Sequence, residues 1–500
     1  MSESQTSSAH DGRLVLRNTA YLGIAEVLTT PLSVVLNAML ARFLGAANLG
    51  HIYFATTICS AAMLFVGWGQ GGPLPAAVAL DRASAGRFLG TSLAWRLGAA
   101  LVTYALVAVS CHMLGFSAAE QWAIGLVFLA SSLANLVNAC QEAIRGFERT
   151  DIAAYTRVGS QLLATVLVIP VLLAGGGLRM TLAAQALGWL AVLVVIVRTL
   201  RPIGVAQLTW DRAAFGHLMR AGTPFVFFDV VLKVQPGIDA FYLARLAPSE
   251  VVGWYAVSQR LVGFLLIPAT ALVGALYPTL CRLYATDRAG FLRTTRESLV
   301  TVSMLVMPVA LGCALYPDIG VSIFGREAFR PAEDTLRVFA LDVFLIYFSM
   351  LIGTALLAAG RQRIWTFVQL VCVVNSLVLD PLLIRYFQAR TGNGGTGLPV
   401  TATISELLMA AVGAALLPKG VLDGALIKRL LLSLASGAVM VGAALSLRGL
   451  SSWVAAPIAG LSYVLALYWT GAVSREQFAA LQGFVGRKLR RKRAPASSPL

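Results

Sequence analysis

Residues 40–55, "LARFLGAANLGHIYFA", have the pattern of one apolar helix ending, a corner, and a second helix beginning. The same skeleton returns at residues 243–256 as "LARLAPSEVVGWYA", with Leu-Ala-Arg and the following glycine at the same spacing. Gly50 therefore falls on Gly253, an offset of 203 positions. A charged, glycine-containing corner that recurs half-way along an apolar chain indicates an internal repeat.

The offset stays constant, without a gap, well beyond the two corners. The matched pairs are Arg17 with Arg220, Glu26 with Asp229, Arg42 with Arg245, Gly71 with Gly274, Pro75 with Pro278, and Phe88 with Phe291. Further on, "RGFER" at 145–149 meets "AGRQR" at 359–363 at a larger offset, because the second half carries the longer loop "FGREAFRPAEDT". We infer two copies of one unit. For the corner arginines Arg42 and Arg245 we favour a structural role.

The composition places both copies in a membrane. The chain of 500 residues is 58% hydrophobic and 12% charged, with a mean hydropathy of +0.78. Soluble proteins are closer to half apolar and a quarter charged. Uncharged runs such as "LAAQALGWLAVLVVIV" suit helices that cross a bilayer, and the alternation typical of a membrane barrel is absent. The sequence predicts an all-α polytopic membrane protein.

We predict about fourteen transmembrane helices, arranged as two six-helix lobes and two further helices. The predicted spans are residues 14–41, 49–72, 89–113, 118–140, 153–174, 180–197, 218–243, 251–280, 297–316, 335–358, 364–384, 398–417, 430–447 and 452–472. The predicted domains are a tail at 1–13, an N-lobe at 14–217, a C-lobe at 218–425, two helices at 426–473 and a basic tail at 474–500. Because each lobe has an even number of spans, the lobes are parallel repeats about a pseudo-twofold axis along the membrane normal.

The net charge of +16 is distributed as a membrane protein requires. Most of the 39 Lys and Arg residues fall on the side that holds both termini, which the positive-inside rule assigns to the cytoplasm. The tail "RKLRRKR" at 487–493 suits a lipid surface, so we expect membrane lipids and no nucleic acid as partners. The N-terminus has no basic region before an apolar run, so no cleaved signal peptide is expected.

The composition also excludes several kinds of site. Six scattered cysteines without a CxxC pair and four histidines without ligand spacing predict neither a disulfide framework nor a metal site. The sequence contains no HExxH, GxSxG or Walker motif, and the glycine-rich stretch at 392–399 is interpreted as a flexible turn. We expect no catalytic residues and no cofactor.

Charges inside the spans are the candidate functional residues, because each costs about 2.5–3.5 kcal/mol at the centre of a membrane helix. The seventh span holds Asp229, Lys233 and Asp239, together with Pro236, which frees a backbone carbonyl. Asp229 and Lys233 are four residues apart on one face. They are either a self-satisfied ion pair that holds helices together or part of a face that lines a water-filled cavity between the lobes.

Further charged residues lie inside other predicted spans. Glu26 is the repeat partner of Asp229 and, as the only acid identified inside a first-lobe span, is a candidate for coupling through proton exchange. Arg260 lies deep in the eighth span, whereas Arg96 in the third either extends to the headgroups or points inward. Three further acids lie closer to predicted span boundaries and are expected at the membrane interface: Asp342, Asp380 and Glu406.

Several segments resemble the Wzx-type polysaccharide flippases of the multidrug/oligosaccharidyl-lipid/polysaccharide exporter superfamily. These are residues 17–55 and their second-lobe counterpart, "AIRGFERTDIAAY", "YPTLCRLYA" and "LLAAGRQRIW". The resemblance implies a central cavity that opens to each side in turn. It also implies a substrate of undecaprenyl-diphosphate carrying a short glycan, moved to the periplasmic leaflet for surface or exopolysaccharide biosynthesis, with other polysaccharide assembly proteins as partners.

The resemblance further implies that basic residues bind the anionic head group; here the candidates are Lys233, Arg260 and Arg96, with Asp239 as a further contact and Glu26 and Asp229 for coupling. Two alternatives stay open at this point. One is a drug or cation antiporter of the same superfamily, which usually has twelve spans. The other is a membrane glycan polymerase or ligase, which needs a large external loop with catalytic groups.

Overall fold

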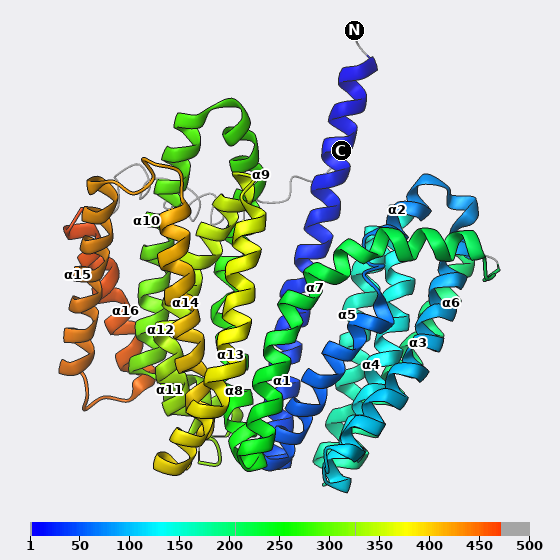
Figure 1. Cartoon of the computed structure of the whole chain (residues 1–500), viewed down its shortest axis with the longest axis horizontal. Helices are drawn as coiled ribbons and strands as arrows, with labels where there is room; N and C mark the ends of the chain where they lie inside the picture. Colours follow the sequence, from blue (N-terminus) through cyan, green and yellow to red (C-terminus); the bar gives the residue numbers. More distant parts are fainter. Residues whose placement is uncertain (1–2, 206, 326, 472–500) are drawn as a thin grey trace, which may run out of the picture. The chain divides into compact units, whose positions relative to one another are not determined.

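The computed structural model describes residues 3–205, 207–325 and 327–471 of the chain. Within these ranges every regular element is an α-helix or a short 3-10 helix, which confirms the predicted all-α class. Eleven helices are long and apolar enough to cross a membrane, or twelve when the bent pair α8 and α9 counts as one span. The chain is therefore a multi-pass membrane protein (Figure 1).

The helices follow one another through short connections, and their bounds are listed here in chain order. They are α1 Glu3–Gly67, α2 Pro73–Leu80, η1 Arg82–Ser84, α3 Ala85–Met113, α4 Ala118–Gly146, α5 Thr150–Leu173, α6 Leu178–Leu200, η2 Arg201–Ile203, α7 Arg212–Leu246, α8 Ser249–Leu265, α9 Ile267–Thr286, α10 Arg288–Leu315, α11 Pro317–Phe324, α12 Ala332–Ala358, α13 Gln362–Thr391, η3 Gly394–Thr396, α14 Gly397–Leu416, α15 Gly424–Ser446 and α16 Ser452–Trp469.

The span count is compatible with the fourteen predicted. Helix α1 contains two predicted spans, which meet at Gly45, where a φ of 78° breaks the helical geometry. Helix α7 is absent from the candidate spans, because Asp229, Lys233 and Asp239 lower its hydropathy. Counting α1 as two spans and adding α7 to the twelve gives fourteen.

The chain divides into two compact units. The first holds Met1–Val257, Val321–Ala332 and Val373–Thr401, and the second holds Ser258–Gly320, Glu333–Cys372 and Ala402–Leu500. The first unit thus contains all of the residues predicted for the N-lobe, together with α7 and the beginning of α8.

The repeated corners lie together in the first unit. Gly50 lies against the carbonyl oxygen of Ser249, and Gly253 lies against that of Ala46, so close that a Cβ atom on either glycine would overlap the oxygen. This reciprocal contact is what a twofold relation between two similar segments produces. Small residues are typical where membrane helices approach backbone to backbone. The glycine recurs because each copy of the corner packs on the other.

The corner arginine Arg42 has the structural role that we favoured for it. Its Nε donates to the carbonyl oxygen of Ile323 at 3.1 Å, and its Nη2 donates to that of Ser322 at 3.3 Å. Both carbonyls belong to the last turn of α11, where helix C-termini leave acceptors unsatisfied. Arg42 therefore fixes the end of α11 to the corner.

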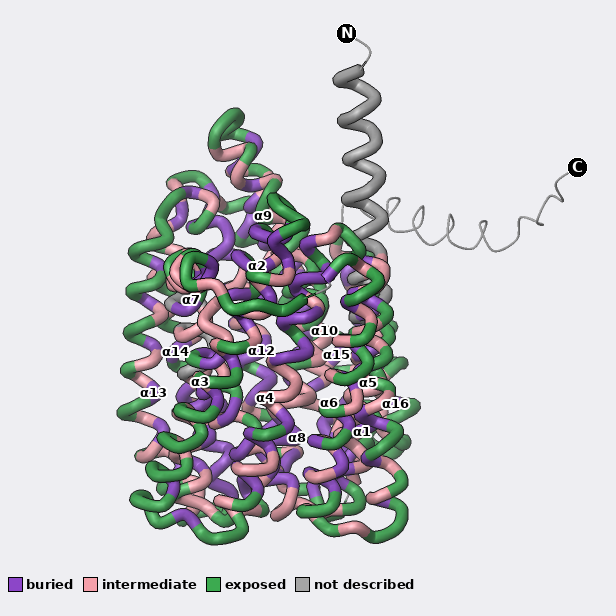
Figure 2. The backbone as a smooth tube through the Cα atoms, turned by 90° about the vertical axis from the view of Figure 1, so that its right-hand side faces the viewer, coloured by how far each residue is buried: buried purple, intermediate pink, exposed green. Residues whose placement is uncertain are grey.

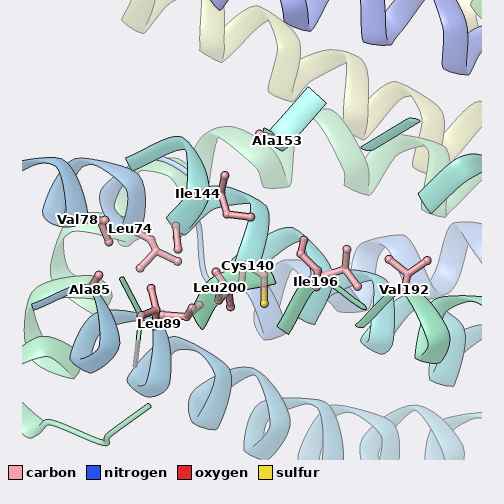
Figure 3. Close-up of a cluster of buried hydrophobic side chains, with 14 of the residues drawn as sticks. Leu74, Val78, Ala85, Leu89, Cys140, Ile144, Ala153, Val192, Ile196 and Leu200 are labelled. Carbon is pink, nitrogen blue, oxygen red and sulfur yellow. The ribbon is translucent and has the colours of Figure 1, made fainter. Parts of the chain in front are cut away.

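A dense core forms at one end of the first unit, where α2, α3, α4 and α6 converge (Figure 3). Leu74 and Val78 from α2 meet Leu89 from α3, Ile144 from α4 and Leu200 from α6, and all five are almost fully buried. In a lipid environment such packing stabilises by close van der Waals contact rather than by exclusion of water.

Many residues on the outer faces of the helices are exposed (Figure 2), and large apolar side chains are among them. Leu101 on α3 is 74% exposed and Leu106 is 64% exposed. Exposure of this kind suits contact with lipid tails and is rare on soluble monomers.

The last two helices pack against α10 within the second unit. Met440 from α15 and Tyr463 from α16 form a buried cluster with Met307 of α10. The Tyr463 hydroxyl donates to the carbonyl oxygen of Met304 at 3.0 Å, which fixes α16 to α10.

Candidate functional site

Two polar cavities lie among the helices of the first unit. Cavity A, of about 430 Å³, is lined by α1, α4, α5 and α6. Cavity B, of about 420 Å³, is lined by α1, α3, α4 and α7. Asn138 and Glu142 of α4 line both. Helix α4 therefore has a polar cavity on each side, inside a bundle built largely from apolar residues.

A buried ion pair lies in the wall of cavity B. Arg96 of α3 donates from Nη2 to Glu142 Oε2 at 2.7 Å, and from Nη1 to the backbone and side-chain oxygens of Asn135 at 2.8 and 3.0 Å. Arg96 is 2% exposed and Glu142 is 8% exposed. Arg96 thus points inward, and the alternative in which it extends to the headgroups is wrong. Glu142 is a second acid within the first-lobe helices, so Glu26 is not the only one.

Uncharged polar residues extend this network. Ser92 on α3 donates to Gln70 Oε1 at 2.6 Å, and Gln70 is only 1% exposed. Together with Asn135 and Asn138, Gln70 makes cavity B rich in hydrogen-bonding groups. These polar residues were not predicted, because single amides and hydroxyls among apolar residues form no periodic pattern.

Cavity A contains two arginines from adjacent helices, Arg145 of α4 and Arg157 of α5. The Arg145 guanidinium has neither an ion pair nor a hydrogen bond within the described residues, and the charge of Glu142 is already offset by Arg96. Cavity A therefore carries positive charge next to hydroxyl and amide groups, with the indole of Trp189 as an aromatic surface. Arg145 lies in "RGFER", a segment that marks the repeat and carries part of the family resemblance but was not predicted to bind a ligand.

An apolar groove lies close to cavity B. It has a volume of about 970 Å³ and is lined by α1, α3 and α7, with Trp68, Trp95 and Trp210 among its residues. Leu64 lines both this groove and cavity B. The first unit thus offers an apolar space and a polar space side by side.

The structure brings two of the predicted site residues together. Asp229 of α7 lines cavity B with Arg96, which favours the cavity-lining interpretation of the charged seventh span. The side chains of Glu26 and Lys233 lie outside the described residues, so their predicted roles stay predictions. Arg260 lies on α8 in the second unit, with its Nη1 atom buried.

Asp239 lies in a different polar cluster of the first unit. The carboxyl groups of Asp239 on α7 and Asp380 on α13 are within hydrogen-bonding reach of one another, and Asp380 also contacts the hydroxyl of Thr401 on α14. In the same cluster Gln235 Nε2 donates to the Ser376 hydroxyl at 3.3 Å.

The expected interfacial position of the three remaining acids is wrong. Asp342 is 2% exposed and Asp380 is 1% exposed, and the Oε2 atom of Glu406 is buried. All three lie well inside helices α12, α13 and α14. Hydropathy indicates how far a residue is from the end of a span. It does not indicate whether neighbouring helices cover the side chain, so it could not predict the burial of these acids.

A family model described as polysaccharide biosynthesis protein matches residues 15–284, more than half of the chain. The chain belongs to this family. The match begins in α1 and ends in α9, so it covers both cavities and both repeated corners. A search of curated proteins finds no match.

Solved structures with the same fold are transporters. A lipid II flippase, MurJ, in an inward closed conformation is 14% identical, with a TM-score of 0.66 over 90% of this chain and 98% of its own. An inward-facing multidrug resistance transporter of the MATE family of the MOP superfamily is 16% identical, with a TM-score of 0.61 over 79% and 96%. A MOP superfamily transporter from Pyrococcus furiosus is 16% identical, with a TM-score of 0.52 over 80% and 93%. The chain therefore has the MOP superfamily transporter fold.

Proposed function

We propose that this protein is a flippase that moves an undecaprenyl-diphosphate-linked oligosaccharide across a bacterial inner membrane. The glycan would pass from the cytoplasmic to the periplasmic leaflet by alternating access and supply surface or exopolysaccharide biosynthesis. The observation that carries the proposal is the pair of polar cavities on either side of Glu142, with an apolar groove beside them. Membership of a polysaccharide biosynthesis family supports it.

The residues of the cavities suit a glycan diphosphate. Arginine binds phosphate oxygens through paired, charge-assisted hydrogen bonds, and Arg145 and Arg157 line one cavity. The amides of Asn135 and Asn138 match sugar hydroxyls as donors and acceptors. The apolar groove offers a place for part of the lipid tail that keeps the tail out of the polar cavities.

The predicted contacts on α7 and α8 complete the proposal. Lys233 and Arg260 would bind the diphosphate and Asp239 the glycan, while Glu26 and Asp229 would couple transport to an ion gradient. Other polysaccharide assembly proteins and membrane lipids are the proposed partners.

The test is a strain that lacks this gene. We expect lipid-linked glycan to accumulate on the inner leaflet and surface glycan to be lost, because no other route moves a diphosphate through hydrocarbon at a useful rate. The wild-type chain should restore surface glycan. The Arg145→Gln/Arg157→Gln variant should restore a small fraction of it while reaching the membrane in normal amount.

The matched control is Arg149→Gln. Arg149 lies in the connection between α4 and α5. Its guanidinium pairs with the nearby Asp151 at 3.2 Å, and it does not line cavity A. Full restoration by this variant is expected. Normal surface glycan in the deletion strain, or a deletion phenotype confined to drug efflux, would overturn the proposal in favour of the antiporter alternative.

A further inference from the structure

Two acids in the second unit, one buried and one half-buried, have no positively charged partner among the described residues. Asp342 of α12 is 2% exposed and its Oδ1 has no hydrogen-bond partner within the described residues. The Oε2 atom of Glu406 on α14 is also buried and has no hydrogen-bond partner within the described residues. Neither acid forms an ion pair in that part of the chain.

The helix register places these two acids close to one another. Gly413 of α14 packs on α12, where a Cβ at this glycine would lie 2.6 Å from Ile352 Cγ2. Helices α12 and α14 run in the same direction, because both are connected to α13 between them. Two turns before this contact, α14 reaches Glu406, and α12 reaches a point about one turn after Asp342. The two acids therefore lie within about one helical turn of the same level. Their carboxyl groups are near enough for their charges to interact.

A third polar side chain points to the same place. Ser349, two turns after Asp342 on α12, is 3% exposed, and its Oγ makes no hydrogen bond of good geometry in the described chain. Its hydroxyl lies beside the Glu406 carboxyl. On α13 the thiol of Cys372 lies near enough to Glu406 to interact with it. It donates to the Ser405 carbonyl oxygen at 3.6 Å and brings no positive charge.

Two carboxylates in this position cannot both be ionised at low cost. Burial disfavours each charge, and the like charge on the neighbour disfavours the second further. A cation must therefore reside with the pair, and a proton is the cation that needs no further ligands. A buried acid inside a membrane domain is by default a functional group.

We propose that Asp342 and Glu406 together bind one proton, held by either carboxyl group, and form the proton-binding site through which transport is coupled to the proton gradient. The coupling rests on the proposed function, whereas proton binding does not. The pair lies on different helices from Glu26 and Asp229, so it is a coupling site that the repeat did not indicate.

Infrared spectroscopy of the purified protein tests proton binding without any substrate. The difference spectrum of the wild-type protein minus Asp342→Asn/Glu406→Gln should contain, at neutral pH, the carbonyl-stretch band of a protonated carboxyl group, which separates this pair from Asp239 and Asp380. Each single variant should shift the pH midpoint of the band, because each acid sets the proton affinity of the other. If the double variant does not fold, the two single variants carry the same test.

The matched control is Asp334→Asn, at the start of α12. Asp334 is exposed and pairs with Arg337 at 2.5 Å, so its removal should leave the band unchanged. A difference spectrum of the wild-type protein minus the double variant that lacks this band overturns the proposal. A band that NaCl abolishes and choline chloride does not overturns it as well, because the site then binds sodium.

Coupling is tested in proteoliposomes with a fluorescent isoprenyl-diphosphate disaccharide. An imposed pH gradient should accelerate flipping by the wild-type protein, and the double variant should flip at the rate seen without a gradient. No flipping by the wild-type protein would contradict the proposed function and leave the infrared result standing. Acceleration of the double variant by the gradient would contradict the coupling alone.

Discussion

At the scale of single residues, the ion pair between Arg96 and Glu142 makes the sharpest prediction. Breaking a buried pair leaves one charge uncompensated, which costs about 3–5 kcal/mol. Arg96→Gln should lower the free energy of unfolding by about this amount, measured by denaturation of the purified protein in detergent. Arg96→Gln/Glu142→Gln should cost less than the single substitution, because neither charge is then left alone.

The chain contains an exposed pair that serves as the control. Arg82 and Glu148 lie 2.8 Å apart, with side chains 57% and 58% exposed. Arg82→Gln should change the free energy of unfolding by only about 0–1 kcal/mol, because water screens this pair. Equal losses for Arg82→Gln and Arg96→Gln would show that burial of Arg96 has no energetic consequence.

At the scale of helices, the reciprocal glycine contact is the feature to test. A methyl group on Gly253 has no room beside the Ala46 carbonyl oxygen, so the two corners must separate. Gly253→Ala should therefore lower the free energy of unfolding by about 1–3 kcal/mol, the usual cost of overpacking. Gly50→Ala should have a similar effect, because its contact with Ser249 is the counterpart.

Gly159 on α5 is the matched control, since a Cβ there would meet no atom within 4 Å. Alanine is favoured over glycine inside a helix by about 0.5–1 kcal/mol, so Gly159→Ala should be neutral or stabilising. Thermal denaturation in detergent distinguishes the two outcomes. Equal melting temperatures for the Gly159 and Gly253 variants would mean that the corners are not held together by this contact.

The helices also show how far the sequence could predict this protein. Hydropathy, charge asymmetry and the repeat of the corner were sufficient for the helical class and an approximate span count, because they depend on composition and on exact spacing. They also drew attention to Arg96 and Asp229, because a charge inside a span is conspicuous. Glu142 and Gln70 were missed, since Glu142 lay beyond the predicted end of its span and an amide carries no charge.

The second-unit acids were misplaced for a related reason. Asp342 and Glu406 were assigned to the interface from their position along the chain, whereas their burial depends on which helices cover them. Which helices pack against one another depends on the three-dimensional structure and cannot be determined from a single sequence. Sequence reasoning therefore succeeded for features along one helix and failed for contacts between helices.

At the scale of the whole molecule, orientation in the membrane is the remaining prediction. Two ion pairs lie at helix ends that the basic residues assign to the cytoplasm: Arg82 with Glu148 in the first unit, and Arg296 with Asp423 at 2.8 Å in the second. Within α13, Gln362 and Thr391 are exposed and stand at the two ends of a helix of 30 residues. Such a helix is about 45 Å long and exceeds the roughly 30 Å of hydrocarbon.

Cysteines at these two positions report the orientation. The native cysteines are buried except Cys281, so Cys281→Ser gives a background with little reactivity. Thr391 is a better external position than Asn393, which is 5% exposed. A membrane-impermeant maleimide should label Thr391→Cys from the periplasm and Gln362→Cys only after the membrane is permeabilised, because the positive-inside rule keeps the arginines around Gln362 in the cytoplasm. Labelling of Gln362→Cys from the periplasm would invert every span and with it the proposed direction of transport.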